Sequence, residues 1–554
     1  MSTDPVGRRR LVLGSAGAAA AAALGVPVIG GRAIAAAPSS AADVHIELEA
    51  VPDQVAVRPG PPTRVWRYRG KLLRGDASVL DASAGGYLGP IIRVRRGQRV
   101  RIDLVNRLPE STIIHWHGLH VPDDMDGHPR FAIAPGERYV YDFTVVNRAG
   151  SYWFHPHPHG RTGKQVYFGL AGLFLVSDDE EAALGLPGGA HDLPLVIQDR
   201  TFDADNQLVY LSESAAAAAE NTPRERGMMG GGMMGGMMGG RGGMRMGGMG
   251  RMMAGMMGVL GDDILVNGRP SASTEVTARP HRLRLLNACN TRTLKLAWSD
   301  GSPLTVIATD GGLLAAPLQR EHVMLAPAER IDLWVDFAHW RAGTELSLRS
   351  LAFEGGLDMG GMMGGMMGGS ALPDGAAFPV MRLRVGSGAA ANRAALPARL
   401  SDLPPPDTRL AINAGDPKVF KLTMGMMTWG VNGRDFDMMR ASELETVKLG
   451  TSEVWEFRND ESGMMGMVMP HSMHVHGLQF RVIERTVGGR FKRDHDTVRT
   501  GFVDEGWKDT VLVMPGERVR ILLRFEDYPG LFLYHCHMLE HEDSGLMRNY
   551  LVKA

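Results

Sequence analysis

One motif recurs three times along the sequence, each time as a tight turn followed by a run of alternating apolar and polar residues. The three copies align with little adjustment: APGERYVYDF (134–143), APAERIDLWVDF (326–337) and MPGERVRILLRF (514–525). Alternation with a period of two is typical of strands, because successive side chains of a strand point to opposite faces. The repeat predicts three copies of one β domain.

Further strand-like runs indicate an all-β fold. They include IRVRRGQRVRIDLVN (92–106) and HRLRLLNA (281–288), and Gly, Pro, Asn and Asp separate the runs, as in sandwiches and Greek-key barrels. The Pro-rich LPPPDTRLA (403–411) reads as the last linker. We place the domains at residues 43–180, 190–385 and 415–554.

Residues 1–37 are typical of an export signal. Three Arg at 8–10 precede an Ala/Gly-rich run that closes on small residues. An Arg pair before a weakly apolar core predicts the twin-arginine pathway, which exports folded proteins. The alternative is an N-terminal membrane anchor, but Pro27 interrupts the run and Arg32 ends it.

The export signal therefore predicts a protein in the periplasm or outside the cell. We also expect a monomer. No other stretch holds about 18 consecutive apolar residues, so no membrane segment is expected after signal removal. The net charge of −1 gives no indication of nucleic-acid or membrane-surface binding.

Histidine pairs with one residue between them occur four times. In a strand, residues two apart share a face, so each pair aims two imidazoles at one place. A single pair is weak evidence for a metal site, whereas four pairs are strong evidence. The pairs are His115 with His117, His155 with His157, His474 with His476, and His535 with His537.

The chain has only two cysteines, and Cys536 lies between two of these histidines. A disulfide with Cys289 is possible after export, but the apolar context of Cys289 favours a buried thiol. Strand parity points Cys536 away from His535 and His537. Two His and one Cys with a weak axial ligand form the blue-copper electron-transfer site, which Cys536, His541 and His471 can supply. The eight paired His are enough for three more metal ions.

These motifs resemble those of the three-domain multicopper oxidases, the group of laccases and bacterial cuprous oxidases. The matching patterns are HxHG, HPHxHG, HxxHxHG and HCHxxxH, together with GWKDTVLVMPGE (506–517). The resemblance implies cupredoxin-like domains and four copper ions, with a three-copper cluster between the first and third domains. It also implies that a donor gives up single electrons and that dioxygen is reduced to water.

The resemblance assigns each ligand. It implies type 1 copper at His471, Cys536 and His541, type 2 copper at His115 and His474, and a type 3 pair at His117, His155, His157, His476, His535 and His537. It also implies proton relays at Asp126 and Glu542, whose alternative is a carboxylate at the surface or one that only supports a ligand.

The chain departs from the family pattern at the axial ligand of the blue copper. The resemblance places an axial Met ten residues after the Cys, where this chain has Leu546. A three-coordinate blue copper with a raised potential is expected, because the thioether that stabilises Cu(II) is missing. The alternative is a loop distortion that brings Met547 to the metal.

Methionine is concentrated in the second domain, at 227–258 and 358–369. Thioethers select Cu(I), so these Met/Gly-rich insertions predict copper handling, with a low-complexity loop as the alternative. In an extended strand, the side chains of Met467 and Met469 would point to the same face as His471, so they are candidates for binding the substrate near the blue copper. Met467 stands where the resemblance places an Asp. Further substrate-binding candidates are Asp437 and Met438.

Three functions stay open. The first is oxidation of Cu(I) by dioxygen in copper tolerance, favoured by the Met tracts. The second is a laccase-like oxidation of phenols, amines or Mn(II), favoured by Leu546. The third is copper sequestration, or a scaffold role without turnover, against which the complete ligand sets argue.

Overall fold

The computed structural model describes residues 41–81, 86–210, 257–355, 372–387, 395–425, 428–459 and 468–554. The chain divides into a short unit of residues 1–41 and a unit of residues 42–554, which holds all the helices and strands named below. Residues 1–37, the tract at 358–369 and Met467 lie outside the described residues, as does the tract at 227–258 up to residue 256. Among the described helices, none is both long and apolar enough to cross a membrane.

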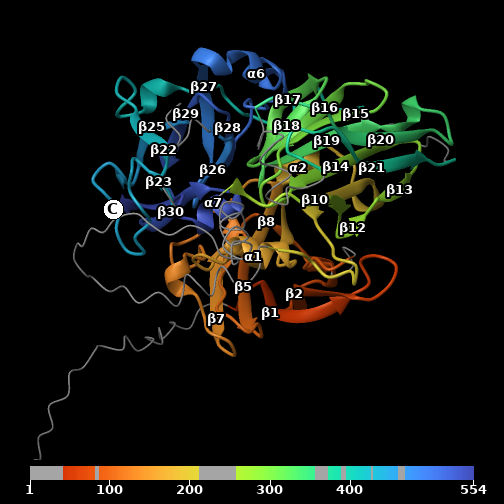
Figure 1. The fold of residues 1–554 in the computed structure, drawn as a ribbon, viewed down its shortest axis with the longest axis horizontal. Coiled ribbons are helices and arrows are strands. Elements are labelled where there is room, and N and C mark those ends of the chain that lie inside the picture. The colour runs from red at the N-terminus through yellow and green to blue at the C-terminus, as the bar shows by residue number, and fades with distance from the viewer. Residues whose placement is uncertain are drawn as a thin grey trace, which may run out of the picture. The chain divides into compact units, whose positions relative to one another are not determined.

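The first domain consists of two sheets that enclose an apolar core (Figure 1, red to orange). One sheet has the order β2 (Thr63–Arg74), β1 (Val44–Val55), β5 (Arg99–Asn106), β7 (Arg138–Thr144). The other has the order β3 (Leu80–Asp81), β4 (Ile91–Arg95), β9 (Gly172–Ser177), β8 (Gly150–Pro156), β6 (Ile114–His117). The run at 92–106 is thus two strands in different sheets, separated by a turn at Gly97, whose φ is +91°.

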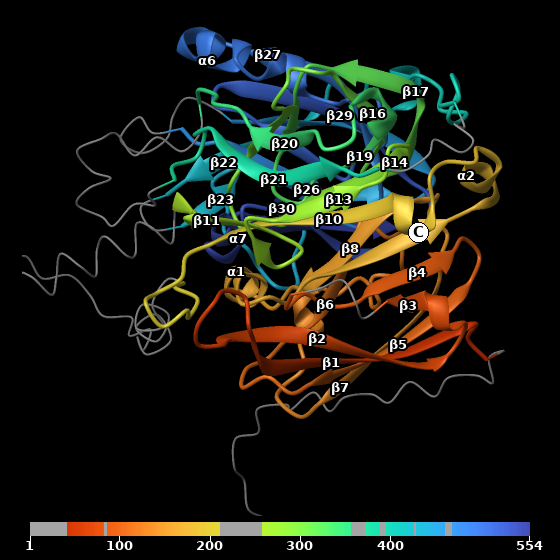
Figure 2. The same cartoon turned by 90° about the vertical axis from the view of Figure 1, so that its right-hand side faces the viewer.

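The second domain also has two sheets, one of seven strands and one of five (Figure 2, yellow to green). One sheet has the order β12 (Arg269–Pro270), β11 (Asp263–Val266), β10 (Asp192–Arg200), β14 (Pro280–Asn287), β19 (Arg330–Asp336), β16 (Leu304–Thr309), β17 (Gly312–Arg320). The other has the order β13 (Ser273–Val276), β21 (Phe378–Val385), β20 (Glu345–Ser350), β15 (Leu294–Trp298), β18 (Val323–Leu325). Helix α2 (Asp179–Ala183) precedes them.

The third domain has two five-stranded sheets (Figure 1, blue-green to blue). One has the order β23 (Trp429–Val431), β22 (Lys418–Met424), β25 (Thr451–Arg458), β29 (Glu517–Phe525), β27 (Phe480–Val487). The other has the order β24 (Thr446–Lys448), β31 (Met547–Lys553), β30 (Gly530–Cys536), β26 (His471–Val475), β28 (Thr510–Val513). Among its described residues, the α-helices are α6 (Lys492–Asp496) and α7 (Leu539–Asp543), and α7 packs against α1 (Thr162–Tyr167) of the first domain.

The Glu of the repeated turn closes that turn in all three domains. Its carboxylate accepts a hydrogen bond from the backbone N–H three residues earlier. The bonds are Ala134 N to Glu137 Oε2 (2.8 Å), Ala326 N to Glu329 Oε2 (2.7 Å) and Met514 N to Glu517 Oε2 (2.8 Å). The sequence repeat therefore encodes one local structure, which starts β7, β19 and β29.

An Asn fastens each turn from the neighbouring antiparallel strand of the sheet: it ends β5 and β14 and directly follows β25. Its backbone carbonyl accepts from the residue before the Glu, at 2.8 Å for Gly136 to Asn106, 2.7 Å for Ala328 to Asn287 and 3.1 Å for Gly516 to Asn459. Those three donor residues all have a left-handed backbone, with φ of +86°, +74° and +71°. Glycine adopts this conformation at little cost, and the second domain supports it with alanine.

Candidate metal centres

Two pairs of antiparallel strands carry the histidine motifs. Strand β6 pairs with β8 so that His115 lies opposite His155, and β26 pairs with β30 so that His474 lies opposite His535. The first strand pair belongs to the first domain and the second to the third. All eight paired histidines are buried, with exposed fractions of 1% or less.

The ring nitrogens sort these eight histidines into a pair and two triplets, each with members from both domains. In the pair, His115 Nε2 lies 3.3 Å from His474 Nε2. One triplet is His157, His476 and His535, with Nε2–Nε2 distances to His535 of 3.3 and 3.0 Å. The other is His117, His155 and His537, in which His155 Nε2 lies 3.4 Å from His117 Nδ1 and 3.2 Å from His537 Nε2.

Burial favours the neutral form of six of these imidazoles. It is the largest cause that lowers the pKa of His117, His155, His157, His474, His476 and His537, and neighbouring histidines lower the pKa further. A neutral imidazole offers a lone pair, the form in which histidine binds a metal. The converging nitrogens are therefore close enough to hold metal ions, as in the triplet His157, His476 and His535.

Asp126 contacts one histidine from each domain. Its backbone oxygen accepts from His115 Nδ1 at 2.7 Å, and its Oδ2 accepts from His476 Nδ1 at 2.7 Å. Glu542 lies on α7 with Oε2 at 3.1 Å from His535 Nδ1 and Oε1 at 3.7 Å from His157 Nε2. Both carboxylates are 1% exposed, so the alternative of a surface carboxylate does not apply to either.

Asp509, which the sequence reasoning missed, has the matching position in the third domain. Its backbone oxygen accepts from His474 Nδ1 at 2.7 Å, and its Oδ1 accepts from His117 Nε2 at 3.0 Å. The only sequence signal was its place inside GWKDTVLVMPGE, because no ligand-like spacing surrounds it.

A separate group forms around Cys536, on the face of β30 opposite His535. Cys536 Sγ lies 3.6 Å from His471 Nδ1 and 3.7 Å from His541 Nδ1, and the two nitrogens lie 3.3 Å apart. Burial raises the pKa of the Cys536 thiol to about 12 and lowers that of His541 to about 3. A bound cation is therefore needed to hold the thiolate at neutral pH. Cys289 is a separate buried free thiol.

Two parts of the chain, residues 71–181 and 411–554, match models of the multicopper oxidase family. A laccase from Bacillus stratosphericus is 30% identical in an alignment 526 residues long, which covers 88% of this chain and 90% of the laccase. The chain belongs to the multicopper oxidase family. The resemblance that the histidine motifs indicated is confirmed.

The solved structure of the McoA multicopper oxidase from Aquifex aeolicus matches this oxidase with a TM-score of 0.71 and 33% identity, over 93% of this chain and 97% of that one. The predicted all-β fold of cupredoxin-like domains is confirmed. The cell division protein FtsP from Shigella dysenteriae is also 30% identical, over 91% of this chain and 92% of FtsP. The family thus includes proteins with different functional names.

Family membership implies copper, dioxygen and a reducing substrate. The donor sets fit copper, because imidazole and thiolate are ligands that copper prefers. Leu546 lies fully buried in the apolar cluster that contains Cys536 and Trp429. Its backbone N–H donates to His541 O and its backbone oxygen accepts from Cys536 N, both at 2.9 Å. Met547 begins β31, where it pairs with His535.

The predicted substrate residues are scattered. Met469 is 4% exposed in the core of the third domain, and its backbone oxygen accepts from Asn459 Nδ2 at 2.6 Å. Asp437 is exposed, and its Oδ1 accepts from Met439 N at 3.0 Å. Met438 is partly buried in the same loop. The roles of these residues stay predictions.

Proposed function

We propose that this oxidase couples one-electron oxidation of Cu(I) to reduction of dioxygen to two waters, and that it acts in copper tolerance. It would hold four copper ions. Type 1 copper is assigned to His471, Cys536 and His541, type 2 copper to His115 and His474, and the type 3 pair to the two triplets. Export by the twin-arginine pathway, to the periplasm or the outside, is part of the proposal.

One observation carries this proposal: Cys536 is joined through the backbone to a member of each triplet. His535 belongs to one triplet and His537 to the other, while the Cys536 side chain lies in the separate group. Copper bound in these groups would supply a one-electron couple at the cysteine and dioxygen reduction at the histidines. The covalent path Cys536–His535 or Cys536–His537 connects the two functions.

The protein must also deliver protons. Reducing one dioxygen to two waters takes four electrons and four protons. Asp126 and Glu542 are placed for this role, because each contacts a ring nitrogen of the eight-histidine group and both are shielded from solvent. They would hold a proton at the carboxylate and pass it inward.

Support for Cu(I) as the donor comes from the two Met/Gly-rich tracts, since thioethers are soft ligands. A laccase-like oxidation of phenols, amines or Mn(II) is the second candidate, favoured by Leu546 beside Cys536. A scaffold role without turnover is the third candidate, since one relative is named as a cell division protein, but ten histidines and one cysteine in four groups support an enzyme.

The test compares Cu(I) with a phenolic donor in three proteins: the intact chain, a deletion of 227–256, and a full-length variant with Leu for each Met of that tract. Met257 is kept, because it packs in the core of the third domain. We expect loss of Cu(I) oxidation alone in both variants. Phenol oxidation without Cu(I) oxidation in the intact chain would contradict the proposal, and equal rates throughout would remove the tract from it.

A further inference from the structure

Asp126 and Asp509 hold the eight-histidine group in the same way from opposite domains. Each accepts from a histidine of the His115–His474 pair with its backbone oxygen and from a triplet histidine with its carboxylate. The two residues differ in what holds them. Asp126 Oδ1 has no hydrogen-bond partner among the described residues, whereas both carboxylate oxygens of Asp509 are bonded.

The partner of Asp509 is Arg330, at the start of β19 in the second domain. Its guanidinium donates from Nη1 to Asp509 Oδ1 at 2.7 Å and from Nη2 to Oδ2 at 2.6 Å. Arg330 Nε also donates to Ser151 O at 2.9 Å, on the strand that carries His155. A bidentate pair of this kind fixes the carboxylate plane, and Arg330 is completely buried.

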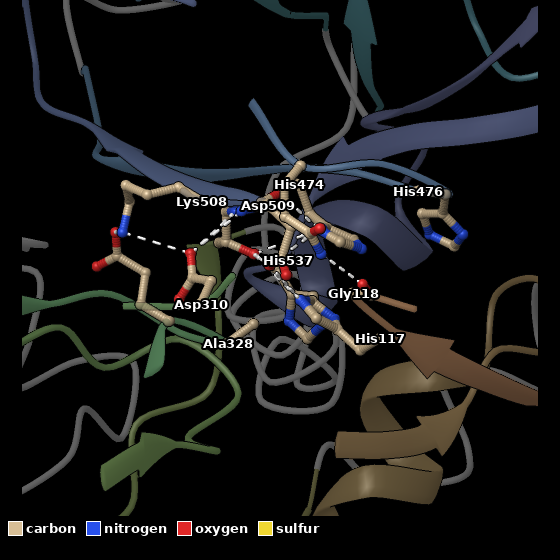
Figure 3. A network of polar contacts seen from close by, with 12 residues as sticks. His117, Gly118, Asp310, Ala328, His474, His476, Lys508, Asp509 and His537 are labelled. Carbon is tan, nitrogen blue, oxygen red and sulfur yellow. Dashed lines mark hydrogen bonds and ion pairs between the residues drawn. The ribbon is translucent and has the colours of Figure 1, made fainter. Parts of the chain in front are cut away.

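Asp310 of the second domain fixes the backbone of the same segment. Its Oδ2 accepts from Asp509 N at 3.2 Å and from Thr510 N at 3.4 Å, and its Oδ1 accepts from Arg330 N at 2.7 Å. Lys508 Nζ lies 3.4 Å from Asp310 Oδ2 and 2.9 Å from Glu329 Oε1 (Figure 3). Both the carboxylate and the backbone of Asp509 are therefore held from the second domain.

Gly118 leaves room for this ion pair. It follows His117, has a φ of +86°, and a Cβ there would lie 2.4 Å from Asp509 Oδ2 and 2.8 Å from Arg330 Nη2. Any larger side chain at this position would clash with the ion pair, so the HxHG motif needs a glycine here.

We propose that Asp509, locked by Arg330 and Asp310, is a positioning residue that orients His474 in the pair and His117 in one triplet. The second domain, which contributes none of the eight histidines, thereby sets the geometry of the group between the other two. Because both of its oxygens are occupied by Arg330, Asp509 orients ligands and does not relay protons. This inference rests on the proposed copper sites.

The test measures type 2 copper in the copper-loaded Asp509→Asn variant. A mononuclear Cu(II) gives an EPR signal, and chelator competition gives its affinity. We expect altered type 2 hyperfine splitting and a type 2 affinity about 10–100-fold lower, the usual effect of removing a partner that orients a ligand. The visible band of the cysteine group should stay unchanged and serves as an internal reference.

Two Arg variants separate positioning from general stability. Arg330→Lys keeps the charge without the two-pronged contact, and it should change the type 2 signal in the same direction even if Asp509→Asn fails to fold. Arg282→Gln is the control, because Arg282 is also buried in the second domain and pairs with Asp332 instead of a histidine partner. It should leave the signal unchanged.

The outcomes distinguish this inference from the proposed function. An intact chain without a type 2 signal would overturn both. A normal type 2 signal and affinity in the intact chain and in both Asp509→Asn and Arg330→Lys would overturn the positioning role alone. Equal changes in Arg282→Gln would also overturn it, because the effect would then be one of domain packing.

Discussion

At the scale of single residues, two buried glutamates near the histidine groups differ in the partners that they contact. Glu542 and Glu540 lie on the same helix, and both are almost completely buried. Only Glu542 approaches the eight-histidine group, whereas Glu540 accepts from Asn290 and Thr291 at 2.7 and 2.8 Å. The pair therefore offers a comparison of two similar carboxylates with different partners.

Glu542→Gln should lower the rate of dioxygen reduction about 10²–10⁴-fold, because an amide cannot deliver the proton that a general acid supplies. The blue absorption should stay nearly intact. Oxygen consumption and the visible spectrum measure the two effects. Glu540→Gln is the matched control and should retain turnover; unchanged turnover in Glu542→Gln would remove the relay role.

A second residue-scale prediction concerns acid stability. Burial lowers the pKa of His128 to about 4, and its Nε2 lies 2.9 Å from Asn549 Oδ1. Below its ordinary pKa of about 6.5, His128 takes up a proton in the unfolded chain but not in the folded one, so stability falls as the pH falls towards 4.

In the copper-free protein, His128→Gln should therefore reduce the loss of unfolding free energy between about pH 7 and about pH 4.5 by about 2–3 kcal/mol. Gln keeps a side-chain donor for Asn549. Urea unfolding at the two pH values gives the difference. An identical pH dependence in the variant and the unchanged chain would show that His128 is not buried in its neutral form.

At the scale of elements, the repeated turn has the same bonds in each domain but different surroundings. Glu137 is exposed, whereas Glu517 is completely buried and also lies 3.0 Å from His495 Nε2 and 3.2 Å from Arg485 Nη1. Alternation of apolar and polar residues predicted the strands that follow these turns. It could not separate β4 from β5, because a turn of three residues hardly interrupts the pattern.

Replacing the Glu of the turn by Ala should therefore lower the free energy of unfolding more in the third domain than in the first. Glu137→Ala should lower the free energy of unfolding by about 1 kcal/mol, the net value of one exposed hydrogen bond. Glu517→Ala should cost about 3 kcal/mol or more, because it leaves buried donors without their partner. Urea unfolding of the copper-free variants measures both values; equal costs would mean that burial does not set the strength of this turn.

At the scale of the whole molecule, strand parity predicted which side chains share a face, and the structure brings those histidines together. It could not predict the contribution of the second domain. The repeat gives an Arg after the Glu in every copy, yet Arg138 and Arg518 are exposed and only Arg330 is buried. Its burial comes from contacts between domains, to Ser151 and Asp509, each 179 residues away in the sequence.

The visible absorption spectrum of the copper-loaded protein, taken with its copper content, tests the central claim most directly. A His2Cys copper site predicts an intense thiolate-to-copper band at about 600 nm, with about four coppers per chain, and Cys536→Ser should lose the band and about one copper. Copper-loaded protein without that band, or a band that survives in Cys536→Ser, would contradict the assignment of Cys536 as the link between the two metal centres.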